Sequence, residues 1–126
     1  MRRSLLVIGL GGILCLTGCA TFSTWAALSP LDRAKATAVA LTDWYERTNA
    51  DVQAAIAGAS PDLAQKYKER VLPVLDRFGR ALLVYVDCVD SWAKNGVKPA
   101  DHDATLRQVT EIQGAIVSEL GTIGGQ

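Results

Sequence analysis

The residues of this 126-residue chain that are able to do chemistry are three cysteines, one histidine and scattered carboxylates. A catalytic site needs a nucleophile, a base and an orienting group held together. The only thiol and imidazole outside the N-terminal region are those of Cys88 and His102, the side-chain types of a cysteine hydrolase. No spacing in the sequence supports that pairing. We therefore predict no catalytic residues and no enzymatic activity.

Candidate metal ligands are equally sparse. His102 stands between Asp101 and Asp103, but three adjacent residues at the start of a helix point in different directions. Asp87 and Asp90 are helical neighbours, yet no histidine or further carboxylate joins them. We predict no metal site, and we interpret His102 as a solvated residue in a charged first turn.

The first eighteen residues differ in composition from the rest. Arg2 and Arg3 form a short positive segment, and the twelve residues from Leu5 to Leu16 then carry no charge. As a helix these twelve would span about 18 Å, which is less than a hydrocarbon core of roughly 30 Å. The pattern predicts a signal peptide, residues 1–18, that is cleaved rather than a permanent membrane span.

A cysteine follows this segment directly. The run Leu16-Thr17-Gly18-Cys19 resembles the lipobox of bacterial lipoproteins, and the resemblance covers the first nineteen residues only. It implies that signal peptidase recognises Leu16, Thr17 and Gly18 and cleaves before Cys19. The Cys19 thiol would then carry diacylglycerol and its amine an N-acyl chain, with no other cofactor. The alternative is a secreted protein in which Cys19 is an unmodified thiol.

The residue after the lipidated cysteine influences sorting in this family, and an aspartate there favours retention in the inner membrane. Ala20 occupies the position here. The resemblance therefore implies the outer membrane, facing the periplasm, with the inner membrane as the alternative. Residues 19–28 would form a lipidated tether, and full extension of Ala20 to Leu28 gives roughly 30 Å. Trp25 within it suits a membrane interface.

Cleavage would change both the charge and the cysteine content. The chain has thirteen basic and thirteen acidic residues, so loss of Arg2 and Arg3 leaves eleven basic residues against thirteen. No basic block survives, and nucleic acid is not a predicted partner. Cys88 becomes the only unmodified thiol. It is either a small buried hydrophobe or, if it faces outwards in an oxidising compartment, an intermolecular disulfide.

The mature chain has helical periodicity and few strand signals. Ser29-Pro30 predicts a first helix that ends near Gly58, and Ser60-Pro61 predicts the start of a second. The first apolar face consists of Leu31, Ala34, Ala38, Leu41, Tyr45, Thr48, Val52 and Ala55, and the second of Leu75, Phe78, Leu82, Tyr85, Val89 and Trp92. Pro73 lacks an N–H, so we expect a kink or break near Leu72.

Asn95-Gly96 predicts the end of the second helix, and Asp101 to Asp103 the start of a third. Its inner face consists of Leu106, Val109, Ile112, Ile116 and Leu120. Gln113 falls on the same face, where its side chain either hydrogen-bonds across the core or lies at the edge of the core. The prediction is an all-α fold: a small three-helix up-down-up bundle over residues 29–121, with the middle helix kinked or split near Pro73. Residues 122–126 would be a flexible tail.

Leu83 and Val84 lie off the apolar face of the second helix, so the segment either sits between two helices or presents a patch to another molecule. With the lipobox, this predicts a non-catalytic lipoprotein anchored by lipid in the bacterial envelope, which binds a protein partner or itself, or serves envelope structure. The alternative is a lipid-anchored carrier or sensor that holds a small apolar ligand among Tyr45, Tyr85 and Trp92. A phage or prophage origin would suit either.

Overall fold

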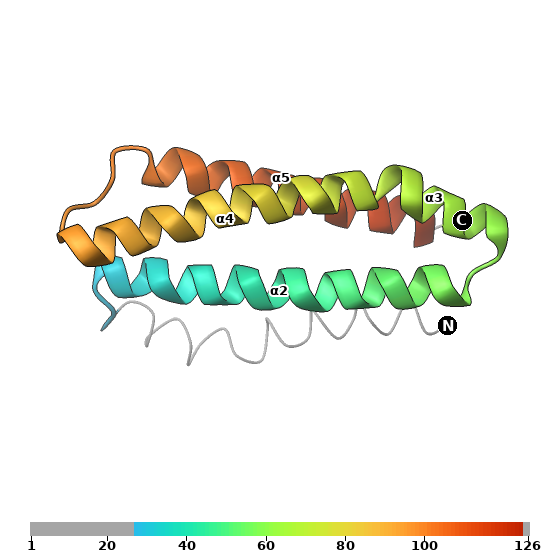
Figure 1. Ribbon diagram of the computed structural model, residues 1–126, viewed down its shortest axis with the longest axis horizontal. Coiled ribbons are helices and arrows are strands. Elements are labelled where there is room, and N and C mark those ends of the chain that lie inside the picture. Colours follow the sequence, from blue (N-terminus) through green and yellow to red (C-terminus); the bar gives the residue numbers. More distant parts are fainter. Residues whose placement is uncertain (1–26, 125–126) are drawn as a thin grey trace.

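The computed structural model describes residues 27–124, and the regular secondary structure in that range is helical. The predicted signal peptide, Leu16, Thr17, Gly18 and Cys19 lie outside the described residues. The helices are α2 (Pro30–Gly58), α3 (Pro61–Arg70), α4 (Leu72–Asn95) and α5 (His102–Gly124). In Figure 1, α3 and α4 follow one another as a single bent rod beside α2 and α5. The all-helical fold with a bent middle helix is confirmed.

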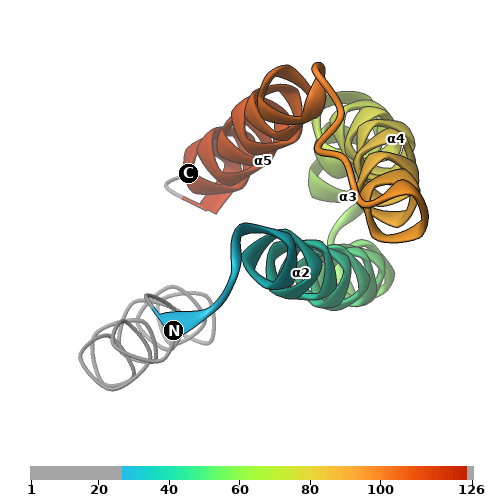
Figure 2. The ribbon, with the colours of Figure 1, turned by 90° about the vertical axis from the view of Figure 1, so that its left-hand side faces the viewer.

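The α4–α5 loop lies at the end of the bundle where α2 begins, and the α2–α3 connection lies at the opposite end (Figure 1). Viewed along its length, the molecule places α2, α4 and α5 at the corners of a triangle (Figure 2). None of the helices within residues 27–124 is long and apolar enough to cross a membrane.

Local signals fix where the helices begin and end. Ser29 and Ser60 each accept a backbone N–H three residues on, from Asp32 at 3.2 Å and from Leu63 at 3.4 Å, and a proline follows each serine. Both caps satisfy N–H groups that a helix start leaves without a partner. Gly96 ends α4 in the left-handed conformation, with φ 71°, which glycine adopts without steric cost.

The bend at Pro73 is confined to a single residue. Val71 separates α3 from α4, but its N–H donates to Tyr67 O and its carbonyl accepts from Leu75 N, both at 2.9 Å. The Val71 side chain is fully buried. The proline therefore redirects the helix with little loss of hydrogen bonding, and apolar contacts hold the bend in place.

Helix α4 supplies the centre of the core. One cluster joins its buried face to α2 and α5, and a second lies where α3, α2 and the end of α5 meet. Leu72 and Leu120 pack against both clusters. The first cluster contains Ala34, Ala38, Leu41, Leu75, Phe78, Ala81, Leu82, Tyr85, Val89, Trp92, Val109, Ile112 and Ile116, and the second contains Val52, Tyr67, Val71 and Ile123.

The prediction of a flexible tail at residues 122–126 is wrong for its first part. Helix α5 continues to Gly124, and Ile123 is only 1% exposed, in the second cluster. Glycine lowers helix stability by about 1 kcal/mol relative to alanine, which favours an end at Gly121. Burial of a large aliphatic side chain contributes roughly 1.5–3 kcal/mol and outweighs that cost.

Gly79 in the middle of α4 allows α2 to approach closely. A Cβ at this position would lie 2.9 Å from the Tyr45 hydroxyl and 3.1 Å from Tyr45 Cζ. The Tyr45 ring cannot easily move away because it stacks on Phe78, with ring centroids 5.7 Å apart. The glycine is thus required by packing rather than by backbone conformation.

We expect Gly79→Ala to lower the free energy of unfolding by about 1 kcal/mol, because the clash with Tyr45 exceeds the gain in helix propensity. The matched control is Gly114→Ala in α5, where an added Cβ would meet nothing within 4 Å. That substitution should raise stability by roughly 0.5–1 kcal/mol. Urea denaturation of both variants measures the difference, and equal stabilisation by the two would contradict the Tyr45 contact.

Candidate functional site

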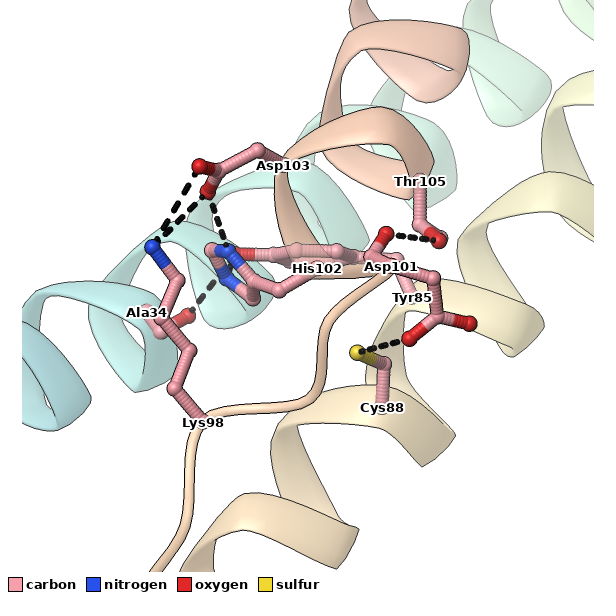
Figure 3. Close-up of polar contacts among 8 residues, drawn as sticks. All are labelled: Ala34, Tyr85, Cys88, Lys98, Asp101, His102, Asp103 and Thr105. Carbon is pink, nitrogen blue, oxygen red and sulfur yellow. Dashed lines mark hydrogen bonds and ion pairs between the residues drawn. The ribbon is translucent and has the colours of Figure 1, made fainter.

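Side chains from α4 and α5 meet a backbone carbonyl of α2 where the α4–α5 loop joins α5 (Figure 3). The ring of His102 lies at the centre and is only 7% exposed. Our interpretation of His102 as a solvated residue is therefore wrong. The loop returns the chain so that the first turn of α5 faces the core, and the ring packs against Tyr85 and Trp92, with centroids 5.4 and 5.3 Å apart.

A chain of polar contacts runs through this ring. The Tyr85 hydroxyl lies 3.4 Å from the carbonyl of Ala34 in α2 and 3.3 Å from His102 Nε2. On the other side of the ring, His102 Nδ1 lies 2.9 Å from Asp103 Oδ1. The chain joins α2, α4 and α5 at one end of the bundle, and it gives each buried polar atom a partner.

The number of available protons decides whether these three polar contacts can all be hydrogen bonds at the same time. The carbonyl of Ala34 and an ionised Asp103 only accept hydrogen bonds, and the Tyr85 hydroxyl has one proton to donate. All three contacts can be hydrogen bonds together only if both imidazole nitrogens carry protons. If the His102 ring is neutral, one of the three contacts has no proton and is not a hydrogen bond.

The carboxylate of Asp103 lies at the solvent end of this chain. Its hydrogen bond with His102, and then the ammonium of Lys98 at 3.1 Å, hold the pKa of Asp103 below its usual value. A group with a lowered pKa stabilises the folded state above its unfolded pKa and loses that contribution as the pH falls through its folded pKa. Lys98 also lies 5.9 Å from the centre of the Trp92 ring.

Cys88 lies beside this chain of polar contacts, but the environment of its thiol disfavours the thiolate. The side chain is 9% exposed, and its Sγ donates to Asp101 Oδ1 at 3.9 Å. Burial, and then the negative charge of Asp101, raise the pKa of the thiol. A nucleophile needs the opposite shift, and the nitrogens of His102 contact Tyr85 and Asp103 instead. The environment favours the buried-hydrophobe interpretation of Cys88 over the intermolecular disulfide.

The aromatic residues that would line a ligand slot are packed against one another. Trp44 meets Phe78 edge-on at 5.1 Å, Tyr45 stacks on the same ring, and Tyr85 is fully buried. Two shallow hollows of about 300 and 210 Å3 lie elsewhere. The first is lined by Val74, Arg77, Gln108, Glu111, Ile112 and Ala115, and the second by Ala38, Val39, Thr42, Asp43 and Val86.

Leu83 and Val84 are exposed on α4, by 66% and 56%. Helix α4 does lie between α2 and α5, as one alternative for this segment has it, but the side chains of Leu83 and Val84 face outwards and are not covered by either helix. Other large hydrophobic residues are also exposed, namely Val39, Val97 and Val117, but none of these is adjacent to another in sequence. Leu83 and Val84 are neighbours in the sequence and both are exposed, and we call this pair the α4 patch.

Sequence reasoning missed the buried position of His102, although a signal for it was present. His102, Val109, Ile116 and Ile123 follow one another at intervals of seven residues, so they lie along one stripe of a helix. The same stripe would have predicted the burial of Ile123. Among residues 27–124, no group of three or more histidine, cysteine or acidic side chains is placed to hold a metal ion.

No family model matches the chain, and neither the curated proteins nor the solved structures include one similar to it.

We expect stability to fall as the pH rises above roughly 8.5, where an unfolded thiol ionises. Burial raises the pKa of both Cys88 and Tyr85 in the folded state. The unfolded chain then releases protons first, which favours unfolding. Cys88→Ala should flatten the slope between about pH 8.5 and pH 10, where tyrosine begins to ionise. Urea denaturation across this range tests it, and equal slopes would exclude a folded-state effect on the thiol.

We also expect Tyr85→Phe and His102→Leu to be energetically coupled by about 1 kcal/mol, because each removes one partner of the same buried hydrogen bond. The matched control replaces Tyr85→Phe by Tyr67→Phe, another buried tyrosine that lies in the second cluster. That pair should be additive. A double-mutant cycle in urea gives both values, and additive effects at Tyr85 would argue against the contact with His102.

Proposed function

We propose that this chain is a lipoprotein of the bacterial cell envelope, anchored by lipid on Cys19, whose helical domain binds a protein partner and performs no chemistry of its own. The observation that carries the partner-binding part is the α4 patch, an exposed leucine next to an exposed valine outside a packed core. Exposed apolar surface of this kind is typical of contact sites when it is contiguous.

The anchor rests on the resemblance of Leu16-Thr17-Gly18-Cys19 to a lipobox. A tether of residues 19–28, about 30 Å at full extension, would hold an up-down-up bundle close to the bilayer. Ala20 favours the outer membrane, facing the periplasm, over the inner membrane. The covalent lipids on Cys19 are the only non-protein groups in the proposal, and nucleic acid is not among its partners.

The packing of the aromatic residues supports partner binding over the carrier or sensor alternative. A carrier needs a cavity of several hundred cubic ångströms between Tyr45, Tyr85 and Trp92. Tyr45 is stacked on Phe78, Tyr85 is fully buried, and Trp92 packs edge-on against His102. Opening a slot there would separate contacts that hold α2, α4 and α5 together. The raised pKa of Cys88 likewise gives no support to a hydrolase.

The test is co-purification from crosslinked bacterial membranes together with metabolic labelling by palmitate. The native chain should incorporate label and recover a defined protein species, and Cys19→Ala should lose the label and the membrane association. Leu83→Glu together with Val84→Glu should keep the label and lose the captured species, because a charge on each side chain opposes burial in an interface.

The matched control is Val39→Glu, which changes another exposed aliphatic side chain, 62% exposed, on α2. Val39→Glu should leave both label and capture unchanged. Absence of label in the native chain would refute the anchor. Capture that survives the double substitution in α4 would refute the patch as the binding surface. Recovery of the same species from soluble Cys19→Ala protein would show that recognition does not require the anchor.

A further inference from the structure

The α4 patch is flanked by charges of opposite sign. Arg77 and Arg80 precede Leu83 and Val84 on the outer face of α4, and Asp87 and Asp90 follow them. All six side chains are exposed. Their spacing of three to four residues places them on the side of the helix away from Phe78, Tyr85 and Val89, which are buried. Asp76 lies on the same face before the patch and Lys94 after it, so the outer face of α4 has a net charge of +1 before the patch (Asp76, Arg77, Arg80) and −1 after it (Asp87, Asp90, Lys94).

This pattern is complementary to itself when reversed. We propose that the partner of the α4 patch is a second copy of this chain, which packs its own α4 against the first in the antiparallel direction. The inference rests on the proposed function and names the partner for that surface. A two-fold axis between positions 83 and 84 places Leu83 opposite the second copy's Val84, Arg80 opposite its Asp87, and Arg77 opposite its Asp90. Each of these contacts occurs twice, as in any isologous interface.

The charges also select the direction of packing. In a parallel pair, Arg80 would face Arg80 and Asp87 would face Asp87, and like charges held close together oppose association. Within one copy, Arg80 pairs with Asp76, and Asp90 with Lys94. These are exposed pairs one helical turn apart, which contribute little to stability. Their exchange for contacts with a second copy therefore carries a small cost.

The size of the patch explains why an anchor would matter. Two apolar side chains from each copy bury little surface, so the pair is weak in solution. Lipid on Cys19 would confine all copies to one bilayer and raise their effective concentration, which strengthens a weak contact without adding a new one. Association should therefore depend on both the α4 patch and the anchor.

The experiment uses cysteine crosslinking of the full chain in bacterial membranes, with Cys88→Ala as the parent. Chains with Arg80→Cys and chains with Asp87→Cys are expressed separately, and then in the same cells so that mixed pairs form. Disulfides are formed with a mild oxidant. The mixed pair should give about tenfold more crosslinked dimer than either variant alone, equivalent to a tenfold preference for the antiparallel register. Val117→Cys on α5, as exposed as Val84 at 56%, is the matched control and should give none.

The outcomes separate this inference from the proposed function. Arg80→Cys that crosslinks best to itself would establish a parallel pair and overturn the inference, as would crosslinks only to a different protein. A dimer in the Cys88→Ala parent, with no introduced cysteine, would show that Cys15 or Cys19 is present as an unmodified thiol and would contradict cleavage and lipidation at Cys19, whatever the register. Charge reversal supplies a second test, in which a photocrosslinker that does not react through amines measures the yield of dimer. Arg80→Asp alone or Asp87→Arg alone should lower that yield. A chain with both substitutions should restore it.

Discussion

Burial of one face of α4 is the constraint on which the rest of this structure depends. Phe78 and Tyr85 are fully buried along it, and both α2 and α5 pack against this helix. A 24-residue helix with so continuous an apolar face cannot be stable alone in water. The positions of the neighbouring helices, the small residues Ala34 and Ala38 of α2, and the glycine opposite Tyr45 all follow from the need to cover that face.

Coverage of α4 also determines how polar groups are treated at the end of the bundle. The Tyr85 hydroxyl is carried into the interior by its ring, so it must find hydrogen-bonding partners there. Ala34 and His102 supply them from the two helices on either side. Asp103 and Lys98 then extend the contacts to the surface. The result is a junction of polar contacts between three helices, and burial raises the pKa of the Cys88 thiol beside it.

The contact surface that we propose lies on the opposite face of the same helix. The inner face of α4 is buried in the core, and the outer face is exposed. The exposed face has an apolar pair, Leu83 and Val84, between Arg77 and Arg80 on one side and Asp87 and Asp90 on the other. A protein of this kind would act through where it is held and what it touches. Lipid anchoring and a weak, directional contact are physically suited to each other, since confinement to a membrane compensates for a small interface.

The sequence by itself determined the helical class, the helix boundaries except the end of α5, and most of the core. Ser29-Pro30, Ser60-Pro61 and Gly96 act locally, through capping and backbone conformation, and apolar periodicity marks the buried faces. The seven-residue stripe of α5 marks which residues share a face with Val109, but the tertiary structure decided that the core covers both ends of that face, at His102 and Ile123, and that Leu83 and Val84 point outwards. Each of these depends on which side of a helix a distant segment covers, and local propensity carries no information about that.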